Sequence, residues 1–206
     1  MISPSRAAAP TTSTLVRGSG AAHPTIVAGV RSDAERWDAR HAQADDVGPQ
    51  PPDLLRGRVD LLPAGGRALD VACGRGAVAR WLAARGFAVD AVDVSAVGLA
   101  ALSGAGVRVV EHDLDDGLPP SCTGPYDVVV CQRFRDPRLY PQLAAALAPG
   151  GLLVISVLSE VDDAPGPFRA PPGELRAAFS ELDVLIDVER DGAAGLVARS
   201  AGLDGR

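Results

Sequence analysis

The sequence predicts an α/β fold: a doubly wound, mostly parallel seven-stranded sheet that ends in an antiparallel hairpin. From Arg67 onward, short apolar runs alternate with segments of helical periodicity, which is typical of a parallel sheet covered on both faces. The last two apolar runs, 182–188 and 194–200, flank Asp191-Gly192, a turn signal for a hairpin. The 206 residues, 47% of them apolar, suffice for one domain with a core.

The individual elements follow from apolar runs, periodicity and helix caps. We expect strands before the hairpin at 67–72, 87–94, 107–111, 126–132 and 151–158. We expect helices at 32–42, 53–62, 76–86, 96–104, 136–151 and 171–180. The residues predicted to cap helix N-termini are Ser32, Asp53, Ser95 and Asp136. The predicted buried side of helix 53–62 consists of Leu54, Leu55, Val59 and Leu62.

The chain divides into a tail and one domain. Residues 1–30 lack periodicity and predict a disordered tail. The domain is expected over 31–203, with N-terminal helices at 31–66, a cofactor-binding core at 67–158, and a C-terminal helix and hairpin at 159–203.

Composition excludes several classes of function. The net charge is −6 and no segment carries a basic stripe, which argues against nucleic-acid binding. No apolar run reaches the roughly 20 residues that cross a bilayer, and the N-terminus lacks the apolar core of a signal peptide. Cys73, Cys122 and Cys131 show no CxxC spacing, so we expect reduced thiols, no metal site and a cytoplasmic location.

The turn after the first strand, in ALDVACGRGAVA (68–79), is the candidate ligand site. Gly74 and Gly76 let a ligand approach backbone N–H groups at a helix N-terminus. The segment GRGAVA fits the GxGxxA pattern of dinucleotide-binding proteins. Asp70 argues against a phosphate, because a carboxylate about 4 Å away costs several kcal/mol at a dielectric of about 20, although Arg75 offsets part of this. An ammonium group would instead gain a charge-assisted hydrogen bond from Asp70.

Acidic residues lie at the ends of the next two strands. Asp93 lies about 20 residues past the glycines, where an acid accepts hydrogen bonds from ribose, and Val94 can press on an adenine face. Asp113 is placed to accept from an adenine amino group, with Leu114 packing nearby. A ribose, an adenine and an ammonium together describe S-adenosylmethionine. The alternative is that Asp70 and Asp93 only cap helices, and that Asp113 is one of several solvated acids.

Five segments in order resemble motifs of class I S-adenosylmethionine-dependent methyltransferases. They are LDVACGRG, VDAVDVS, VEHDLDDGLP, PYDVVVCQ and LAPGGLLVISV, within residues 67–158. ERWDARHA (35–42) is distantly similar to the opening helix of tellurite- and thiopurine-resistance methyltransferases, which act on small molecules. The sequence departs from the pattern at Ala72, where the family often has glycine, and at QRFRDP, where many small-molecule members have a histidine or an aromatic pair.

The resemblance implies a Rossmann-like methyltransferase with S-adenosylmethionine as cofactor. It implies that Asp70 and the backbone of Ala72 and Gly74 hold the methionine part, and that Gly76 permits close approach. It implies that Asp93 binds the ribose. The residues that it places around the adenine and the methyl-transfer centre are Val94, Asp113, Leu114, Cys131 and Gln132.

In-line methyl transfer requires alignment of the acceptor and exclusion of water rather than a catalytic triad, so we assign no catalytic residue. The loop at 159–174 is short, which favours a small-molecule acceptor. Trp37 either covers the cofactor or is a buried anchor. Arg133 and Arg135 either grip an anionic acceptor or are solvated. His41 and His112 are more often structural than a general base.

Two other hypotheses remain. A nicotinamide-dependent reductase with a Tyr-x-x-x-Lys pair is excluded, because the chain has no lysine, but other NAD(P)-binding oxidoreductases are not. A protein that binds S-adenosylmethionine without transferring its methyl group fits the same residues. The acceptor and the oligomeric state are left open.

Overall fold

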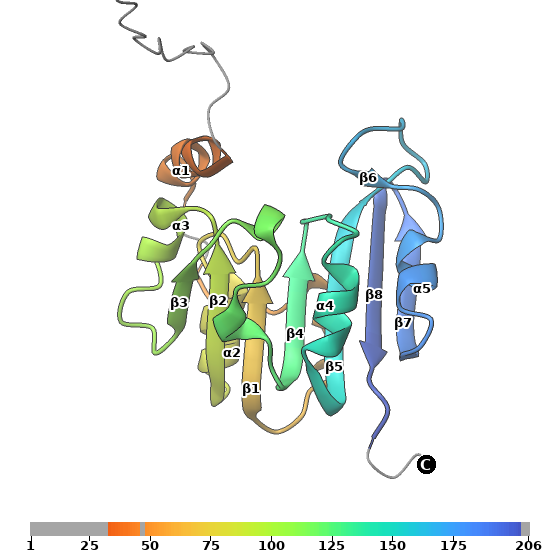
Figure 1. The fold of residues 1–206 in the computed structure, drawn as a ribbon, viewed down its shortest axis with the longest axis horizontal. Coiled ribbons are helices and arrows are strands. Elements are labelled where there is room, and N and C mark those ends of the chain that lie inside the picture. The colour runs from red at the N-terminus through yellow and green to blue at the C-terminus, as the bar shows by residue number, and fades with distance from the viewer. Residues whose placement is uncertain (1–32, 46–47, 203–206) are drawn as a thin grey trace, which may run out of the picture. The chain divides into compact units, whose positions relative to one another are not determined.

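The described part of the chain, residues 33–45 and 48–202 of a computed structural model, forms a sheet with helices on both faces (Figure 1). The tail predicted for residues 1–30 and the predicted cap Ser32 lie outside the described residues. The sheet order is β3-β2-β1-β4-β5-β8-β7. Its strands are β1 (Gly66–Val71), β2 (Phe87–Asp93), β3 (Arg108–Glu111), β4 (Tyr126–Gln132), β5 (Leu147–Ser159), β7 (Asp183–Arg190) and β8 (Ala193–Arg199).

This sheet confirms the predicted fold class. The strands from β3 to β5 are parallel to one another, whereas β8 runs antiparallel to both β5 and β7. The turn between β7 and β8 has positive φ at Asp191 and Gly192, as a two-residue hairpin turn requires. The two-residue strand β6 (Arg169–Ala170) pairs with β5 and was not predicted. The chain order reverses between β1 and β4, which makes their carboxyl ends the expected position for a ligand.

Five α-helices and four 3-10 turns connect the strands in the described part of the chain. The α-helices are α1 (Asp33–Ala42), α2 (Ala77–Ala83), α3 (Ala96–Ala100), α4 (Tyr140–Ala145) and α5 (Glu174–Ala178). The 3-10 turns are η1 (Asp53–Leu55), η2 (Val59–Leu61), η3 (Leu114–Asp116) and η4 (Pro120–Cys122). Ser95 caps α3 as predicted, since its side chain accepts a hydrogen bond from the Gly98 N–H.

Two predicted helices differ from the structure. The segment 53–62 forms η1 and η2 instead of one helix, because the backbone at Gly57 turns to φ +76°. Asp53 therefore caps no α-helix, and Val59 is 43% exposed rather than buried. Asp136 does not cap α4: its side chain accepts from the Arg138 N–H in a local turn, and the helix begins at Tyr140.

The core consists of two apolar layers, one on each face of the sheet. One layer joins β4 and β5 to α4 and α5 through Ile155, Leu143 and Phe179, among others. The other layer joins the sheet to α2 and η1 through Leu82 and Leu55. The named side chains are 1% exposed or less. Rigid packing on both faces holds the carboxyl ends of the central strands in place.

Candidate functional site

The candidate site lies at the carboxyl ends of β1, β2 and β4. The turn after β1 has positive φ at Ala72, Gly74 and Gly76. Gly76 has a packing reason to be glycine, because a Cβ there would lie 2.2 Å from a methyl carbon of Leu102. The space beside this glycine is therefore filled by the protein, whereas the resemblance assigned it to a bound cofactor.

Asp70 carries a buried, unpartnered oxygen beside this turn. The residue is 4% exposed, and its Oδ2 has no hydrogen-bond partner in the described part of the chain. Burial raises the pKa of Asp70 to about 7, the backbone N–H of Ala79 opposes this shift, and the nearby charge of Asp93 adds to it. A buried oxygen without a donor is destabilising. A ligand that brings a donor or a positive charge would remove that penalty.

Asp93 joins two turns of the site. Its Oδ2 accepts from the Gly74 N–H at 2.8 Å, and its Oδ1 accepts from the Ser95 N–H at 2.9 Å. The residue thus fixes the glycine turn against the start of α3, in line with the capping alternative. Each carboxylate oxygen has a second lone pair, so these bonds leave Asp93 able to accept from a ligand hydroxyl as well.

A hollow of about 390 Å³ lies beside Asp93, lined by Ala34, Val94, Glu111, His112 and Asp113. The structure thus brings together Val94 and Asp113, two of the residues predicted to frame an adenine. Leu114 instead lies in the core at 5% exposure. The prediction missed Glu111 as a lining residue and gave His112 no place in the site. Their positions in the sequence could have indicated this, because Glu111 ends β3 and His112 begins the turn after it.

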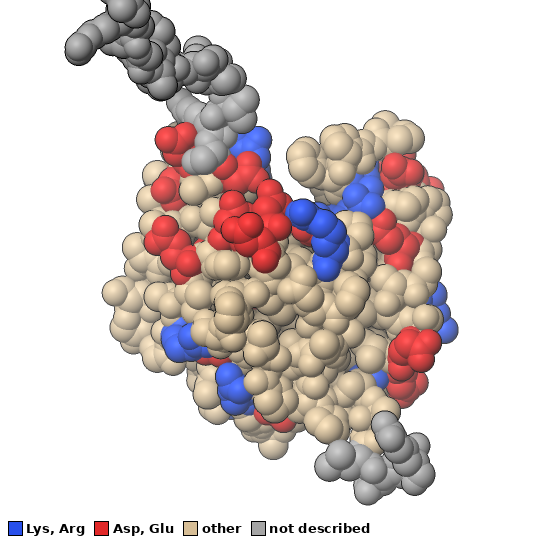
Figure 2. Space-filling view, in the orientation of Figure 1, with Lys and Arg blue, Asp and Glu red and all other residues tan. Residues whose placement is uncertain are grey.

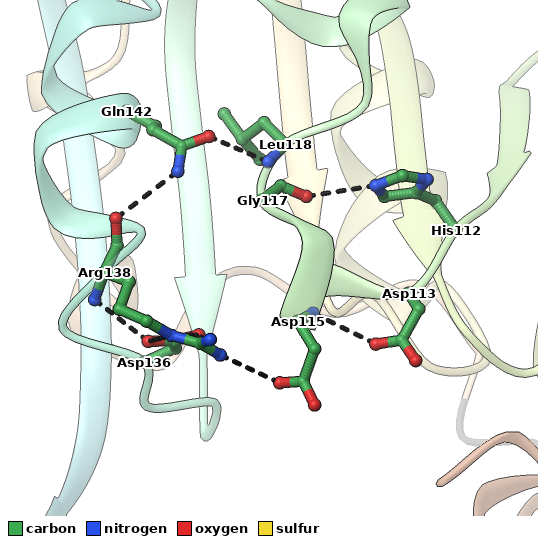
Figure 3. A network of polar contacts seen from close by, with 8 residues as sticks. All are labelled: His112, Asp113, Asp115, Gly117, Leu118, Asp136, Arg138 and Gln142. Carbon is green, nitrogen blue, oxygen red and sulfur yellow. Dashed lines mark hydrogen bonds and ion pairs between the residues drawn. The ribbon is translucent and has the colours of Figure 1, made fainter. Parts of the chain in front are cut away.

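Polar contacts fix the wall of this hollow (Figure 3). Asp113 accepts from the Asp115 N–H at 3.0 Å, and His112 Nε2 lies 3.1 Å from the Gly117 carbonyl oxygen. Arg138 bridges Asp115 and Asp136 across the gap to the segment before α4. The exposed side of the wall is acidic: carboxylates gather beside an arginine on this face (Figure 2).

The end of β4 supplies the other predicted residues. Cys131 is 1% exposed, and burial raises the pKa of its thiol to about 12, with a smaller contribution from Asp70. It is therefore an uncharged packing residue at neutral pH. Gln132 uses its side-chain oxygen to accept from the Asp53 N–H at 2.8 Å. Arg133 has φ +58° and pairs with the Asp53 carboxylate at 3.1 Å.

The two predicted acceptor-binding arginines have different surroundings. Arg133 has a side chain that is 80% exposed and reaches solvent beside the site. Arg135 makes a two-pronged ion pair with Glu174, which also accepts from the hydroxyl of the buried Tyr140. Its positive charge is already matched within the protein. Arg133 is also paired, with Asp53, so exposure is what separates the two: the Arg133 side chain is 80% exposed and the Arg135 side chain 18%.

Helix α1 brings Trp37 and His41 to the glycine turn. The two rings stack with centroids 5.7 Å apart, and the His41 carbonyl accepts from Arg75 at 2.8 Å. Trp37 is 38% exposed, so the buried-anchor alternative is wrong. The contact of His41 with Gly74 was not predicted, because nothing in the local sequence signals a contact between residues so far apart.

Comparisons with known proteins point to one kind of protein. Residues 44–183 match the family model described as a methyltransferase domain. The chain is 35% identical over 144 residues to ribosomal RNA small subunit methyltransferase C of Chromohalobacter salexigens, covering 62% of this chain and 40% of that protein. It is 33% identical over 106 residues to the ubiquinone biosynthesis O-methyltransferase of a Caulobacter species, covering 45% of this chain and 41% of that protein.

Among solved structures, TehB from Haemophilus influenzae superposes with a TM-score of 0.58 at 20% identity, covering 65% of this chain and 57% of that one. The chain spans about two fifths of the length of the two curated relatives. None of the described helices is long and apolar enough to cross a membrane.

Proposed function

Because the chain belongs to the methyltransferase domain family, we propose that it transfers a methyl group from S-adenosylmethionine to a small-molecule acceptor. Family membership confirms the predicted resemblance and its cofactor, S-adenosylmethionine. The activity of the whole protein and its acceptor belong to the proposal, since the chain spans only part of its curated relatives.

One observation supports the cofactor assignment most strongly: the unpartnered oxygen of Asp70 at the glycine turn. A buried carboxylate with a free oxygen fits the ammonium group of the methionine part. It disfavours the pyrophosphate of a dinucleotide, because both groups are negatively charged. The residues present therefore fit S-adenosylmethionine better than NAD(P).

The proposed contacts follow the order of the strands. Asp70 and the backbone of Ala72 and Gly74 hold the methionine part, and Asp93 accepts from the ribose. The remaining residues proposed to line the cofactor are Val94 and Asp113 at the hollow and Gln132 at the end of β4, while Leu114 and Cys131, 5% and 1% exposed, are proposed to support the site from the core. Gly76 contributes by letting α2 pack against Leu102.

The bound cofactor supplies a methyl group already activated by its positive sulfonium. The protein then has to align the acceptor, exclude water and hold the adenosine in place. The end of β4 is suited to aligning an acceptor, because Gln132 and Arg133 both contact Asp53 of η1. These contacts fix the backbone on which an acceptor is proposed to rest, with Arg133 at its edge, while Trp37 is proposed to contact the acceptor from α1.

A small molecule is favoured over RNA as the acceptor. One relative is named a ribosomal RNA methyltransferase, so RNA is the relevant alternative. The face of the hollow is acidic (Figure 2), whereas RNA-binding surfaces carry arginine and lysine toward the phosphates. Arg138 and Arg135 on this edge are paired with carboxylates.

The three free cysteines support the proposed cytoplasmic location.

Calorimetric titration of the purified protein with S-adenosylmethionine, S-adenosylhomocysteine and NADH tests the cofactor. We expect micromolar binding of the first two and no heat with NADH. Binding of NADH alone would contradict the proposal. Methyl transfer to a panel of small acceptors then separates an enzyme from a protein that only binds S-adenosylmethionine, since the latter shows saturable binding without turnover.

A further inference from the structure

Helix α1 is held to the domain without a buried side chain. It spans Asp33–Ala42, and none of its residues is buried. Surface helices are normally held by an apolar face packed on the core. The inner side of α1, formed by Ala34, Asp38, Ala39 and His41, is only half-buried, so its packing is shallow and its polar contacts carry more of the attachment.

Asp38 makes the central contact. Its Oδ1 accepts from the Ser95 hydroxyl at 2.6 Å and from the Val97 N–H at 3.1 Å, at the start of α3. The Ser95 and Val97 hydrogen bonds hold the pKa of Asp38 below its usual value, so the carboxylate is charged at neutral pH. Charge-assisted hydrogen bonds of this kind are stronger than neutral ones.

Ser95 links Asp38 directly to the proposed cofactor site. The Ser95 N–H donates to Asp93, which also accepts from the Gly74 N–H. A second contact ties the end of α1 to the same region, because Arg75 in the glycine turn donates to the His41 carbonyl at 2.8 Å. These two polar contacts of α1 thus lie on the turns proposed to bind the cofactor.

We propose that Asp38 is a positioning residue that latches α1 over the cofactor-binding turns and slows release of the cofactor. This inference rests on the proposed function. With Asp38 bound to Ser95, the His41 ring lies against the glycine turn, where a Cβ at Gly74 would be 3.1 Å from Cε1. The His41 ring stacks on Trp37, so the latched helix holds a pair of aromatic rings next to the glycine turn. Loss of the latch leaves α1 with weaker contacts, among them the Arg75 hydrogen bond and the shallow packing of half-buried residues such as Ala34 and His41.

Substitution of Asp38 tests the latch in two ways. Asp38→Ala removes both hydrogen bonds, and Asp38→Asn keeps an acceptor oxygen but removes the charge. Asp33→Ala is the matched control, because it removes a carboxylate of the same helix that pairs with Arg36, one turn further along α1. The core should remain folded in all variants, since no residue of α1 is buried; thermal unfolding checks this.

The first measurement is the dissociation rate of S-adenosylhomocysteine by stopped flow. We expect Asp38→Ala to raise it about tenfold, Asp38→Asn to raise it less, and Asp33→Ala to change it by less than twofold. The second measurement is acrylamide quenching of tryptophan fluorescence without ligand. Trp81 is 7% exposed, so quenching reports mainly Trp37, and we expect it to increase in Asp38→Ala and to stay unchanged in Asp33→Ala.

The outcomes separate the latch from the proposed function. If the wild-type protein binds neither S-adenosylmethionine nor S-adenosylhomocysteine, the proposed function fails, whatever the quenching shows. If it binds them and quenching is unchanged in Asp38→Ala, there is no latch. If quenching increases but the dissociation rate stays within twofold of the wild type, Asp38 fixes a helix that has no positioning role, and the inference is overturned.

Discussion

Two buried aspartates on neighbouring strands show how differently polar groups are satisfied by residues at the amino ends of the strands and by residues at their carboxyl ends. We call these two ends of the sheet the amino edge and the carboxyl edge. Asp90 on β2 is 7% exposed, and its oxygens accept from Arg108 at 2.7 Å, Tyr126 at 2.7 Å and Arg67 at 3.3 Å. Burial alone would raise its pKa, but the Arg108 and Tyr126 hydrogen bonds hold that pKa below its usual value. Asp70 on β1, equally buried, keeps one oxygen without a partner among the described residues and has a raised pKa.

The two carboxylates lie at almost the same level of the sheet, since Asp70 pairs in register with Ala91, the residue after Asp90, and the difference follows from the partners that each one reaches. Asp90 is the middle residue of β2, but its partners Arg67, Arg108 and Tyr126 stand at or next to the first residues of β1, β3 and β4 and close a complete network. Asp70 lies at the carboxyl ends, where the chain turns away and leaves room for a ligand. Positive φ at Ala72 and Arg133, directly after β1 and β4, adds backbone strain to the same edge. The network of Asp90 is closed within the protein, whereas Asp70, near the carboxyl edge, keeps an oxygen that we propose a ligand satisfies.

The largest expected effect is on the pH dependence of stability through Asp70. Its folded pKa of about 7 lies above the usual 3.8, so stability is fully present below about pH 4 and is lost as pH rises through 7. The full loss is on the order of 4 kcal/mol. Asp70→Asn should lack this decline and be the more stable ligand-free protein at pH 8. Chemical denaturation at pH 5 and pH 8 should capture about 3 kcal/mol of this loss, because the rest falls below pH 5.

The same substitution should act in the opposite direction on binding. Asp70→Asn should lose affinity for S-adenosylmethionine much more than for adenosine, which has no ammonium group. Asp187→Asn, at an exposed position of β7, is the control and should change neither quantity. Parallel pH profiles for Asp70→Asn and the wild type would show that Asp70 is already satisfied in solution.

Removing Asp90 should have the next largest effect. Asp90→Ala leaves the hydroxyl of Tyr126, which is 0% exposed, without its partner and releases two arginines. We expect a loss of about 3 kcal/mol in the free energy of unfolding, measured by urea denaturation, with cofactor affinity within twofold of the wild type. Asp187→Ala should cost less than about 0.5 kcal/mol. A large loss of cofactor affinity in a folded Asp90→Ala protein would show that Asp90 also supports binding, and the contrast with Asp70 would not hold.

Asp93 should combine both roles, because it pins two turns and is proposed to bind the ribose. Asp93→Ala should weaken S-adenosylmethionine binding at least tenfold, which corresponds to about 1.4 kcal/mol. Calorimetric titration measures this change, and far-ultraviolet circular dichroism verifies folding. Unchanged affinity in a folded variant would remove Asp93 from the proposed site and leave it only the structural contacts with Gly74 and Ser95.

The contrast between the Asp90 network and the acids at the carboxyl ends also explains which parts of the structure the sequence could predict. The carboxyl ends of parallel strands meet at one edge, so acids placed just after strands, such as Asp93 and Asp113, could be assigned to one site before any contact was known. The network of Asp90 could not, because its partners lie 18 to 36 residues away and meet it only through strand register. The contact between Asp38 and Ser95, 57 residues apart, is invisible for the same reason.

The wrong helix at 53–62 and the wrong cap at Asp136 each have a cause within a few residues of the segment. The apolar periodicity of residues 53–62 predicted one helix. Periodicity carries no information about the backbone conformation of Gly57, which adopts φ +76° and divides the segment into two 3-10 turns. Similarly, Asp136 has the chemistry of a helix cap but uses it on Arg138, two residues on. Side chains that favour caps also favour isolated turns, so the residue type alone does not decide between them.

The smallest expected effect tests whether the carboxyl edge stores backbone strain. Ala72 has φ +54°, a conformation that costs an L-residue about 1 kcal/mol and glycine almost nothing. Glycine also increases the entropy of the unfolded chain, which offsets part of that gain. Ala72→Gly should therefore stabilise the protein by about 0.5 kcal/mol in urea denaturation. Ala88→Gly, at an exposed position within β2, should destabilise it by about 0.5 to 1 kcal/mol. Opposite signs for the two variants would locate strain at the turn beside Asp70, whereas equal losses would mean that Ala72 is relaxed and that only the unmet charge distinguishes this edge.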